Sequence, residues 1–180
     1  MRGTKRWGFS LVELTLVLAL LGILALVALP SGQPTQSYKL ELAAVELADA
    51  YRFARSESLR TGSPHGTHTD PSQNRVRVFR ADTGTTPATP IYDVYHPIHR
   101  KLYDVDLDLA PEWTGVAMSA GATWLGACSA PTLLSFDAGG TPHCSNPGAV
   151  LLDQATVQLS LAGETRDVVI DGETGRVWIQ

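Results

Sequence analysis

The feature that most constrains this chain is an apolar run that begins at Phe9 and ends at Leu29, just before Pro30. Glu13 is the only ionisable residue within the run. About 20 apolar residues are enough for one helix to cross a bilayer. The residues ahead of the run carry three basic side chains and no acidic one: Arg2, Lys5 and Arg6. Because basic flanks stay on the cytoplasmic side of a membrane, we expect the remainder of the chain to face the opposite side.

Glu13 requires an explanation, because an ionised carboxylate in hydrocarbon is costly unless it is paired, protonated or functional. No basic residue lies within one helical turn of Glu13. Its partner must therefore come from another chain, or be a terminus created by processing. Cleavage after Gly8 would meet both conditions, since the new amine of Phe9 would lie four residues from Glu13.

The order Gly8, Phe9 and Glu13, after a short basic leader and with Pro30 closing the apolar run, resembles the class III signal of type IV prepilins and pseudopilins. The resemblance implies cleavage between Gly8 and Phe9 by the prepilin peptidase, and methylation of the new Phe9 amine. It also implies that Glu13 pairs with the N-terminal amine of a neighbouring subunit. An ordinary signal anchor would leave Glu13 unexplained, and a secretory signal peptide has a shorter apolar core.

The resemblance divides the chain into a leader at residues 1–8, a transmembrane and assembly helix at 9–30, and a periplasmic domain at 31–180. The implied partners are other pilins or pseudopilins, the prepilin peptidase and the inner membrane. The mature chain would keep 11 basic and 18 acidic residues, a formal net charge of −7. An acidic domain repels phosphate backbones, so non-specific nucleic-acid binding is disfavoured.

Cys128 and Cys144 are the two cysteines of the chain, and both follow the apolar run. In an oxidising compartment such a pair indicates one disulfide that closes a short loop, worth roughly 3 kcal/mol in the chain-entropy model. Two free buried thiols are the alternative. The predicted compartment favours the disulfide.

Beyond the apolar run, the pattern changes from helical to extended. Within residues 36–61, apolar and small side chains recur at helical spacing and form one stripe: Leu40, Ala44, Leu47, Tyr51, Ala54 and Ser58. Gly62 and Pro64 then end the helical pattern. Alternating patterns then predict strands at 75–80, 103–109, 113–118, 132–137, 155–161, 166–171 and 176–179. One long helix followed by many short strands predicts an α+β domain with an antiparallel sheet, a pilin-like fold.

Two local patterns narrow the resemblance to the FimT/GspH-type minor pseudopilins. The first is the segment from Ala54 to Ser58, which resembles that family's Ala-Arg-x-Glu-Ala segment. The second is the stretch from Leu134 to Gly139, followed by a hairpin that ends at Thr174 to Val177. These motifs are short and degenerate, whereas the prepilin signal is specific.

No catalytic constellation or cofactor motif stands out in the sequence, and we expect a protein that is not an enzyme. Asp104, Asp106 and Asp108 are a candidate calcium site, but alternating acids on one strand face lie about 7 Å apart, which favours a solvated face. His96 and His99 lack a third metal ligand at convincing spacing, so loop histidines are the better interpretation.

DNA binding is the alternative from a different functional class. Some FimT-like pilins bind DNA for uptake, and the resemblance places the contact at a Gly-Arg-x-Arg element near the C-terminus. The matching residues here are Gly175, Arg176, Val177 and Trp178. Tryptophan replaces the second arginine, which removes one phosphate contact but leaves a ring that can stack on a base. DNA is therefore a less favoured partner than other pilins.

These observations predict a minor pilin or pseudopilin, a structural subunit of a type IV pilus or of a type II secretion pseudopilus. The anchor would hold the processed subunit in the inner membrane until Glu13 pairs with a neighbouring Phe9 amine. The globular domain would then face outward from the filament.

The predicted processing can be tested at Gly8. Replacement of Gly8 by a bulky residue should abolish cleavage, because a peptidase that admits this position requires a residue with almost no side chain. Electrophoresis and N-terminal sequencing of the product measure the outcome. A mature form that still begins at Phe9 would show that the signal is misinterpreted.

Overall fold

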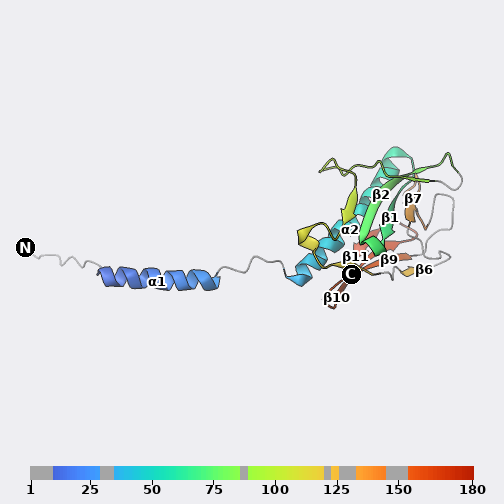
Figure 1. Cartoon of the computed structure of the whole chain (residues 1–180). Helices are drawn as coiled ribbons and strands as arrows, with labels where there is room; N and C mark the ends of the chain where they lie inside the picture. Colours follow the sequence, from blue (N-terminus) through green and yellow to red (C-terminus); the bar gives the residue numbers. More distant parts are fainter. Residues whose placement is uncertain (1–9, 29–34, 86–88, 120–122, 126–132, 145–153) are drawn as a thin grey trace, which may run out of the picture. The chain divides into compact units, whose positions relative to one another are not determined.

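The computed structural model describes residues 10–28, 35–85, 89–119, 123–125, 133–144 and 154–180 (Figure 1). The chain forms two compact units, residues 1–34 and 35–180. Residues 29–34, which include the predicted end of the apolar run at Pro30, lie outside the described residues.

The first unit contains the helix α1, Leu11–Ala28. Its first turn is closed by the hydrogen bond that Leu14 N donates to the Ser10 carbonyl at 3.1 Å. Apolar side chains are exposed all around its described part, from Leu11 to Leu21. Within the described residues, no helix meets the length and hydropathy required of a membrane span.

The second unit begins with the helix α2, Gln36–Thr61, which has the predicted bounds. The Thr35 hydroxyl caps its first turn by accepting from Tyr38 N at 3.4 Å. Its C-cap is Gly62, in the left-handed conformation with φ +66°, which glycine adopts without steric cost. Every residue of the predicted apolar stripe is fully buried, from Leu40 to Ser58. The predicted helix is therefore confirmed in both bounds and facing.

The strands form two antiparallel sheets that both pack against α2. The first sheet has the order β3-β2-β1-β7-β8, with β4 pairing β2. Its strands are β1 His65–Asp70, β2 Arg75–Asp82, β3 Thr89–Ile91, β4 Asp104–Asp106, β7 Leu133–Phe136 and β8 Pro142–His143. The second has the order β11-β10-β9-β5, with β6 pairing β9. Its strands are β5 Ala117–Met118, β6 Thr123–Leu125, β9 Gln154–Leu161, β10 Glu164–Asp171 and β11 Val177–Ile179. The predicted α+β class with antiparallel pairing of the strands is confirmed.

Two of the predicted strands, 103–109 and 113–118, are each four residues shorter than expected. The segment 103–109 is extended only to Asp106, because the Asp106 carboxylate then accepts a hydrogen bond from Asp108 N and turns the chain. Leu109 is consequently exposed instead of buried. The segment 113–118 follows a short 3-10 helix, Pro111–Trp113, and only Ala117–Met118 is a strand. Proline at the start of this helix favours a turn over an extended strand.

The strand β1 was not predicted, and its packing depends on Gly66. Phe79 on β2 is the cross-strand partner of Gly66, and Ser135 on β7 is its partner on the other side. A Cβ atom at Gly66 would lie 2.6 Å from the Phe79 ring and 2.8 Å from Ser135 Cα, and it would also overlap the Leu134 carbonyl. Phe79 is fully buried as a result. The absence of a side chain at Gly66 thus allows three strands to pack around a phenyl ring.

Replacement of Gly66 by alanine should destabilise the second unit by about 3 kcal/mol, at the upper end of overpacking costs, because the new methyl meets backbone atoms that cannot yield. In a domain of this size, thermal unfolding should shift by roughly 6–12 °C. Gly84→Ala is the matched control, since its Cβ meets only the flexible Asp82 side chain, at 3.2 Å. Equal melting temperatures for the two variants would contradict this account of β1.

Candidate functional site

Of the residues predicted to act in assembly, the structure describes Glu13. It lies in the first turn of α1 and is exposed. α1 contains no basic residue, so its own helix offers Glu13 no counter-ion. Gly8 and Phe9 lie outside the described residues, and their roles in cleavage and methylation stay predictions.

In the second unit, Arg55 on α2 contacts the segments that follow residues 134–139 and Thr174, which carried the resemblance to the FimT/GspH-type pseudopilins. Arg55 Nε donates to the Gly140 carbonyl at 3.2 Å. A Cβ atom at Gly175 would lie 2.6 Å from that same carbonyl and 2.8 Å from Arg55 Nε. We call these three residues, Arg55, Gly140 and Gly175, the Arg55 junction. The junction joins the helix to a loop of the first sheet and to a loop of the second.

Both glycines of the junction are presented by turns that an aspartate organises. The Asp137 carboxylate accepts from Gly139 N at 2.8 Å and Thr141 N at 2.9 Å, and Gly140 adopts φ +78°. Partial burial raises the pKa of Asp137, but hydrogen bonds from Thr141 and His143 outweigh this and lower it below the usual range. These bonds therefore stabilise the turn while Asp137 is ionised.

The second turn is likewise held by hydrogen bonds to an aspartate carboxylate. The Asp171 carboxylate accepts from Thr174 N at 2.7 Å and from the Thr174 hydroxyl at 2.6 Å. Gly175, with φ +66°, donates its N–H to the Asp171 carbonyl at 2.9 Å. The Thr174 hydrogen bonds lower the pKa of Asp171. For both aspartates the stabilisation is present above the ordinary carboxyl pKa and is lost as the pH falls through the lowered value.

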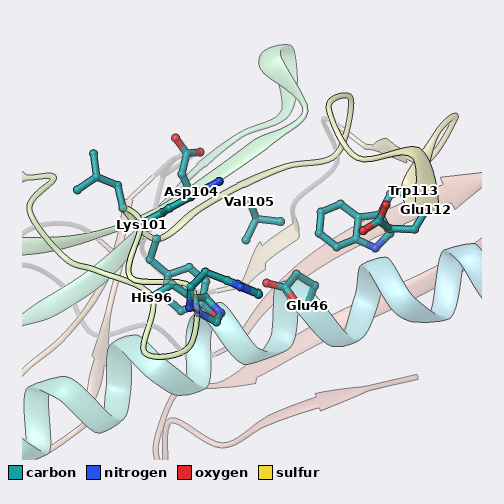
Figure 2. Close-up of a pocket in the computed structure, with 10 residues that line it drawn as sticks. Glu46, His96, Lys101, Asp104, Val105, Glu112 and Trp113 are labelled. Atoms are coloured by element: carbon teal, nitrogen blue, oxygen red, sulfur yellow. Dashed lines mark hydrogen bonds between the residues drawn. The ribbon is translucent and has the colours of Figure 1, made fainter.

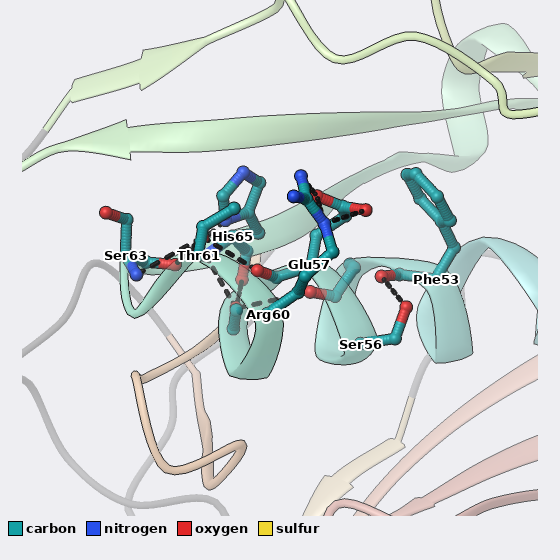
Figure 3. A network of polar contacts seen from close by, with 9 residues as sticks. Phe53, Ser56, Glu57, Arg60, Thr61, Ser63 and His65 are labelled. Atoms are coloured by element: carbon teal, nitrogen blue, oxygen red, sulfur yellow. Dashed lines mark hydrogen bonds and ion pairs between the residues drawn. The ribbon is translucent and has the colours of Figure 1, made fainter.

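One helical turn beyond Arg55, the Ser58 hydroxyl links α2 to the first sheet. It is fully buried, donates a hydrogen bond to the Phe136 carbonyl at 3.0 Å, and accepts one from His65 N at 2.8 Å. Figure 3 shows the neighbouring contacts at the end of α2, including the pairing of Arg60 with Glu57. Arg52 also contributes, because its guanidinium donates to the Val177 carbonyl of β11 at 3.1 Å. Polar groups of α2 thus attach it to both sheets.

Two proteins of known structure are similar to most of this chain. The *Pseudomonas aeruginosa* type IV minor pilin FimU superposes with a TM-score of 0.51 at 19% identity, over 81% of this chain and 91% of its own. The *Vibrio cholerae* type II secretion minor pseudopilin EpsH superposes with a TM-score of 0.52 at 12% identity, over 79% of this chain and 96% of its own. The chain has the minor-pilin fold.

Sequence comparisons point to the same superfamily over shorter stretches. The type IV major fimbrial protein FimA of *Dichelobacter nodosus* is 37% identical over 69 residues, which is 38% of this chain and 43% of FimA. A fimbrial protein of the same organism is 33% identical over 88 residues, 49% of this chain and 54% of that protein. The matches thus span about half the length of these relatives. No family model matches the chain.

The chain therefore resembles the type IV pilin and pseudopilin superfamily in both sequence and fold, as predicted. These relatives are pilus and pseudopilus subunits and not enzymes, in agreement with the expectation for this chain. The motif spacing did not predict that Arg55 and Gly175 meet, and it missed Gly140. The Gly139-Gly140 pair after Asp137 is the signal that could have found the turn.

The predicted DNA-contacting residues lie at β11 of the minor-pilin fold. Arg176 is exposed and Trp178 is partly buried, and both line a shallow pocket of about 470 Å³ with Asp171 and Thr174. Asp171 lies close enough to Arg176 for the arginine charge to contribute to lowering the Asp171 pKa, after the larger effect of Thr174. A carboxylate beside Arg176 reduces the attraction of this surface for phosphate.

The aspartates of the candidate calcium site each have a protein partner. Asp104 forms a bidentate ion pair with Arg75, whose Nε lies 2.6 Å from Asp104 Oδ1. Asp106 accepts from Asp108 N at 3.0 Å, and Asp108 accepts from Asn74 Nδ2 at 2.9 Å. Among the described residues, no three His, Cys, Asp or Glu side chains are placed to hold a metal ion. The carboxylates therefore organise the strand and the turn that follows it.

Cys144 is buried, and the described part of the chain contains no free thiol. Its predicted partner, Cys128, lies outside the described residues. The disulfide between Cys128 and Cys144 therefore stays a prediction.

The Arg55 junction can be tested with two glycines of equal φ. Gly62 and Gly175 both have φ +66°, but a Cβ atom would meet nothing within 4 Å at Gly62. Gly62→Ala should cost about 1–2 kcal/mol, the cost of the left-handed conformation for alanine. Gly175→Ala should cost at least about 2 kcal/mol more, because its methyl also overlaps the Gly140 carbonyl.

Urea unfolding of the two purified variants measures the difference. Arg55→Met, which keeps the aliphatic stem and removes the donor, should cost about 1 kcal/mol. Equal losses for Gly62→Ala and Gly175→Ala would show that the junction contributes nothing beyond backbone strain.

Proposed function

We propose that this chain is a minor pilin or pseudopilin, a structural and assembly subunit of a type IV pilus or a type II secretion pseudopilus. The observation that carries the proposal is the joint presence of the Gly8, Phe9 and Glu13 signal before an apolar helix and of a minor-pilin fold after it. Neither feature alone specifies this function. Both machines are retained because FimU and EpsH, one from each, resemble the chain to the same degree.

The exposed surface of α1 supports an anchoring and packing role. Its leucines and valines from Leu11 to Leu21 are exposed on every side of the helix, with fractions from 44% at Val17 to 79% at Leu11. A helix that is apolar all around requires lipid or other protein around it. In the proposal, the processed subunit rests in the inner membrane, with the second unit in the periplasm, and α1 later packs among the helices of neighbouring subunits.

Glu13 has a specific role in this proposal. In an apolar setting its charge is tolerable when a positive group reaches it, and the N-terminal amine of a neighbouring Phe9 would supply that group. Pairing would set the axial register between subunits as well as attract them. Prepilin peptidase cleavage after Gly8 and methylation of Phe9 precede this step in the proposed sequence of events.

The alternative, DNA uptake through β11, has less support. Trp178 replaces the second arginine of the DNA-binding element, Asp171 lies beside Arg176, and the mature chain has a formal net charge of −7. These features all weaken phosphate binding. Filament assembly is consequently the function we assign.

Glu13→Gln tests the assembly role, because it keeps the shape of the side chain and removes its charge. The variant should insert, be cleaved after Gly8 and fold normally, yet its cross-linking to neighbouring anchors should fall by at least tenfold. Removal of one partner of a buried ion pair costs about 3–5 kcal/mol, which is enough for this loss. Site-specific cross-linking within α1 measures it.

Thr15→Val is the matched control, since it removes a nearby hydroxyl that donates to the Val12 carbonyl at 2.9 Å and leaves the charge in place. It should cross-link as the wild type does. Wild-type cross-linking and piliation or secretion by Glu13→Gln would contradict the proposed pairing. A subunit at the filament tip, with no subunit above it, is the arrangement that would produce this result.

A further inference from the structure

A pocket of about 520 Å³ opens between α2, the segment from His96 to Val105, and the 3-10 helix Pro111–Trp113 (Figure 2). Glu46 of α2 lies between His96 on one side and Glu112 and Trp113 on the other. The pocket belongs entirely to the second unit. It is remote in sequence from the Glu13 signal and shares no residue with the Arg55 junction.

Glu46 differs from the other acidic residues of α2. Glu41, Asp49 and Glu57 each form an ion pair with an arginine: Arg166, Arg52 and Arg60, respectively. Glu46 is partly buried, yet in the described part of the chain it forms neither a hydrogen bond nor a salt bridge within contact distance. Burial raises the pKa of Glu46, an effect that the charge of Asp49 increases and that His96 and His99 oppose.

The walls of the pocket suit a planar cation. Trp113 offers an aromatic face, and Glu112 places a second carboxylate on the same side. On the opposite side, the rings of His96 and His99 stack with their centroids 4.8 Å apart, and the centroids of the His96 and Tyr103 rings are 4.5 Å apart. Lys101 lies at the end of the pocket away from Glu112 and Trp113. Carboxylates next to aromatic faces are the groups that bind guanidinium and ammonium ions.

The rim of the pocket indicates that the cation belongs to a polypeptide. Seven large apolar side chains are exposed in the described part of the second unit, and four of them lie in, or within two residues of, the segments His96 to Val105 and Pro111 to Trp113 that wall the pocket. These are Tyr95, Ile98, Leu102 and Leu109, with Ile98 and Leu109 exposed by 78% and 81%. A charged anchor surrounded by apolar contacts that exclude water is the usual anatomy of a protein-binding hot spot.

We propose that this pocket binds an arginine side chain of a protein partner, with Glu46 as its counter-ion, Trp113 as its stacking surface and the apolar rim as the surrounding contact. Arginine is favoured over lysine because its planar guanidinium can stack on Trp113 while it donates two hydrogen bonds to a carboxylate. The site goes beyond the assembly role of α1, since it would recognise a partner through the globular unit.

The test uses the unit from Thr35 to Gln180, because all residues of the main core cluster lie between Leu40 and Val177. N-acetyl-arginine amide is the probe, and the isosteric but neutral N-acetyl-citrulline amide is its control. The indole N–H signal of Trp113 should shift on titration with the arginine compound, with millimolar affinity, and should not respond to the citrulline compound. Because α1 is absent, the result is independent of the anchoring and assembly proposal.

Glu46→Gln should weaken arginine binding by at least tenfold. Glu41→Gln removes the same charge from the same helix outside the pocket, and should leave binding unchanged. Equal responses to the arginine and citrulline compounds, or full binding by Glu46→Gln, would overturn the proposal. A Trp113 shift caused by inorganic phosphate in place of the cation would overturn it as well.

A second readout separates a binding role from a structural one. A raised folded-state pKa means that the ionised Glu46 disfavours folding. The folded state therefore loses stability as the pH rises from the ordinary carboxyl pKa through the raised pKa of Glu46. Glu46→Gln should therefore raise the melting temperature by a few degrees at pH 7, and the gain should vanish in acid, where Glu46 is protonated. The other titratable groups around it are unchanged in this variant: Asp49, His96, His99, Lys101, Tyr103, Asp104 and Glu112. A lower melting temperature at pH 7 would show that Glu46 is retained for folding, contrary to the proposal.

Discussion

The close approach of α2 to two sheets is the constraint on which the second unit depends. Five alanines on the buried part of the helix are completely inaccessible: Ala43, Ala44, Ala48, Ala50 and Ala54. Their small side chains let the helix axis lie near strands of both sheets, while Leu40, Leu47 and Tyr51 fill the space between. The sheets share this one helix as their common support. A larger residue at any of these alanines would separate them and disturb the turns that meet at Arg55.

Much of this arrangement could be predicted from the sequence, and the exceptions have physical causes. The bounds of α2 could be predicted because apolar residues recur at helical spacing along it and because Gly62 ends the helix. β9 and β10 follow from alternation and a turn whose residues, Ala162 and Gly163, have positive φ. β1 escaped prediction because its buried positions include His65, Thr67 and Thr69, which are polar.

The burial of His65 and Thr69 is compensated by tertiary contacts that no local pattern reveals. The backbone N–H of His65 donates to the Ser58 hydroxyl, and the Thr69 hydroxyl bonds to Tyr51 at 2.6 Å. The same limit applies to the candidate sites. Residues 54–58 and 174–177 could be recognised as motifs, but their meeting at Arg55 depends on the packing of two sheets. The isolation of Glu46 likewise becomes visible only when the positions of the other arginines are known.

Glu13 and Glu46 share one property in the two units of the chain. Each carboxylate lies on a helix and forms no ion pair among the described residues of its own unit. An unpaired carboxylate that is taken out of water opposes folding or insertion of the isolated subunit, whereas a cation from another chain would convert that cost into attraction. A subunit built in this way is stabilised by association more than a fully paired one would be. Glu13 would thus favour contacts between anchors, and Glu46 contacts between globular units, so that a neighbour must match at both levels to satisfy both charges.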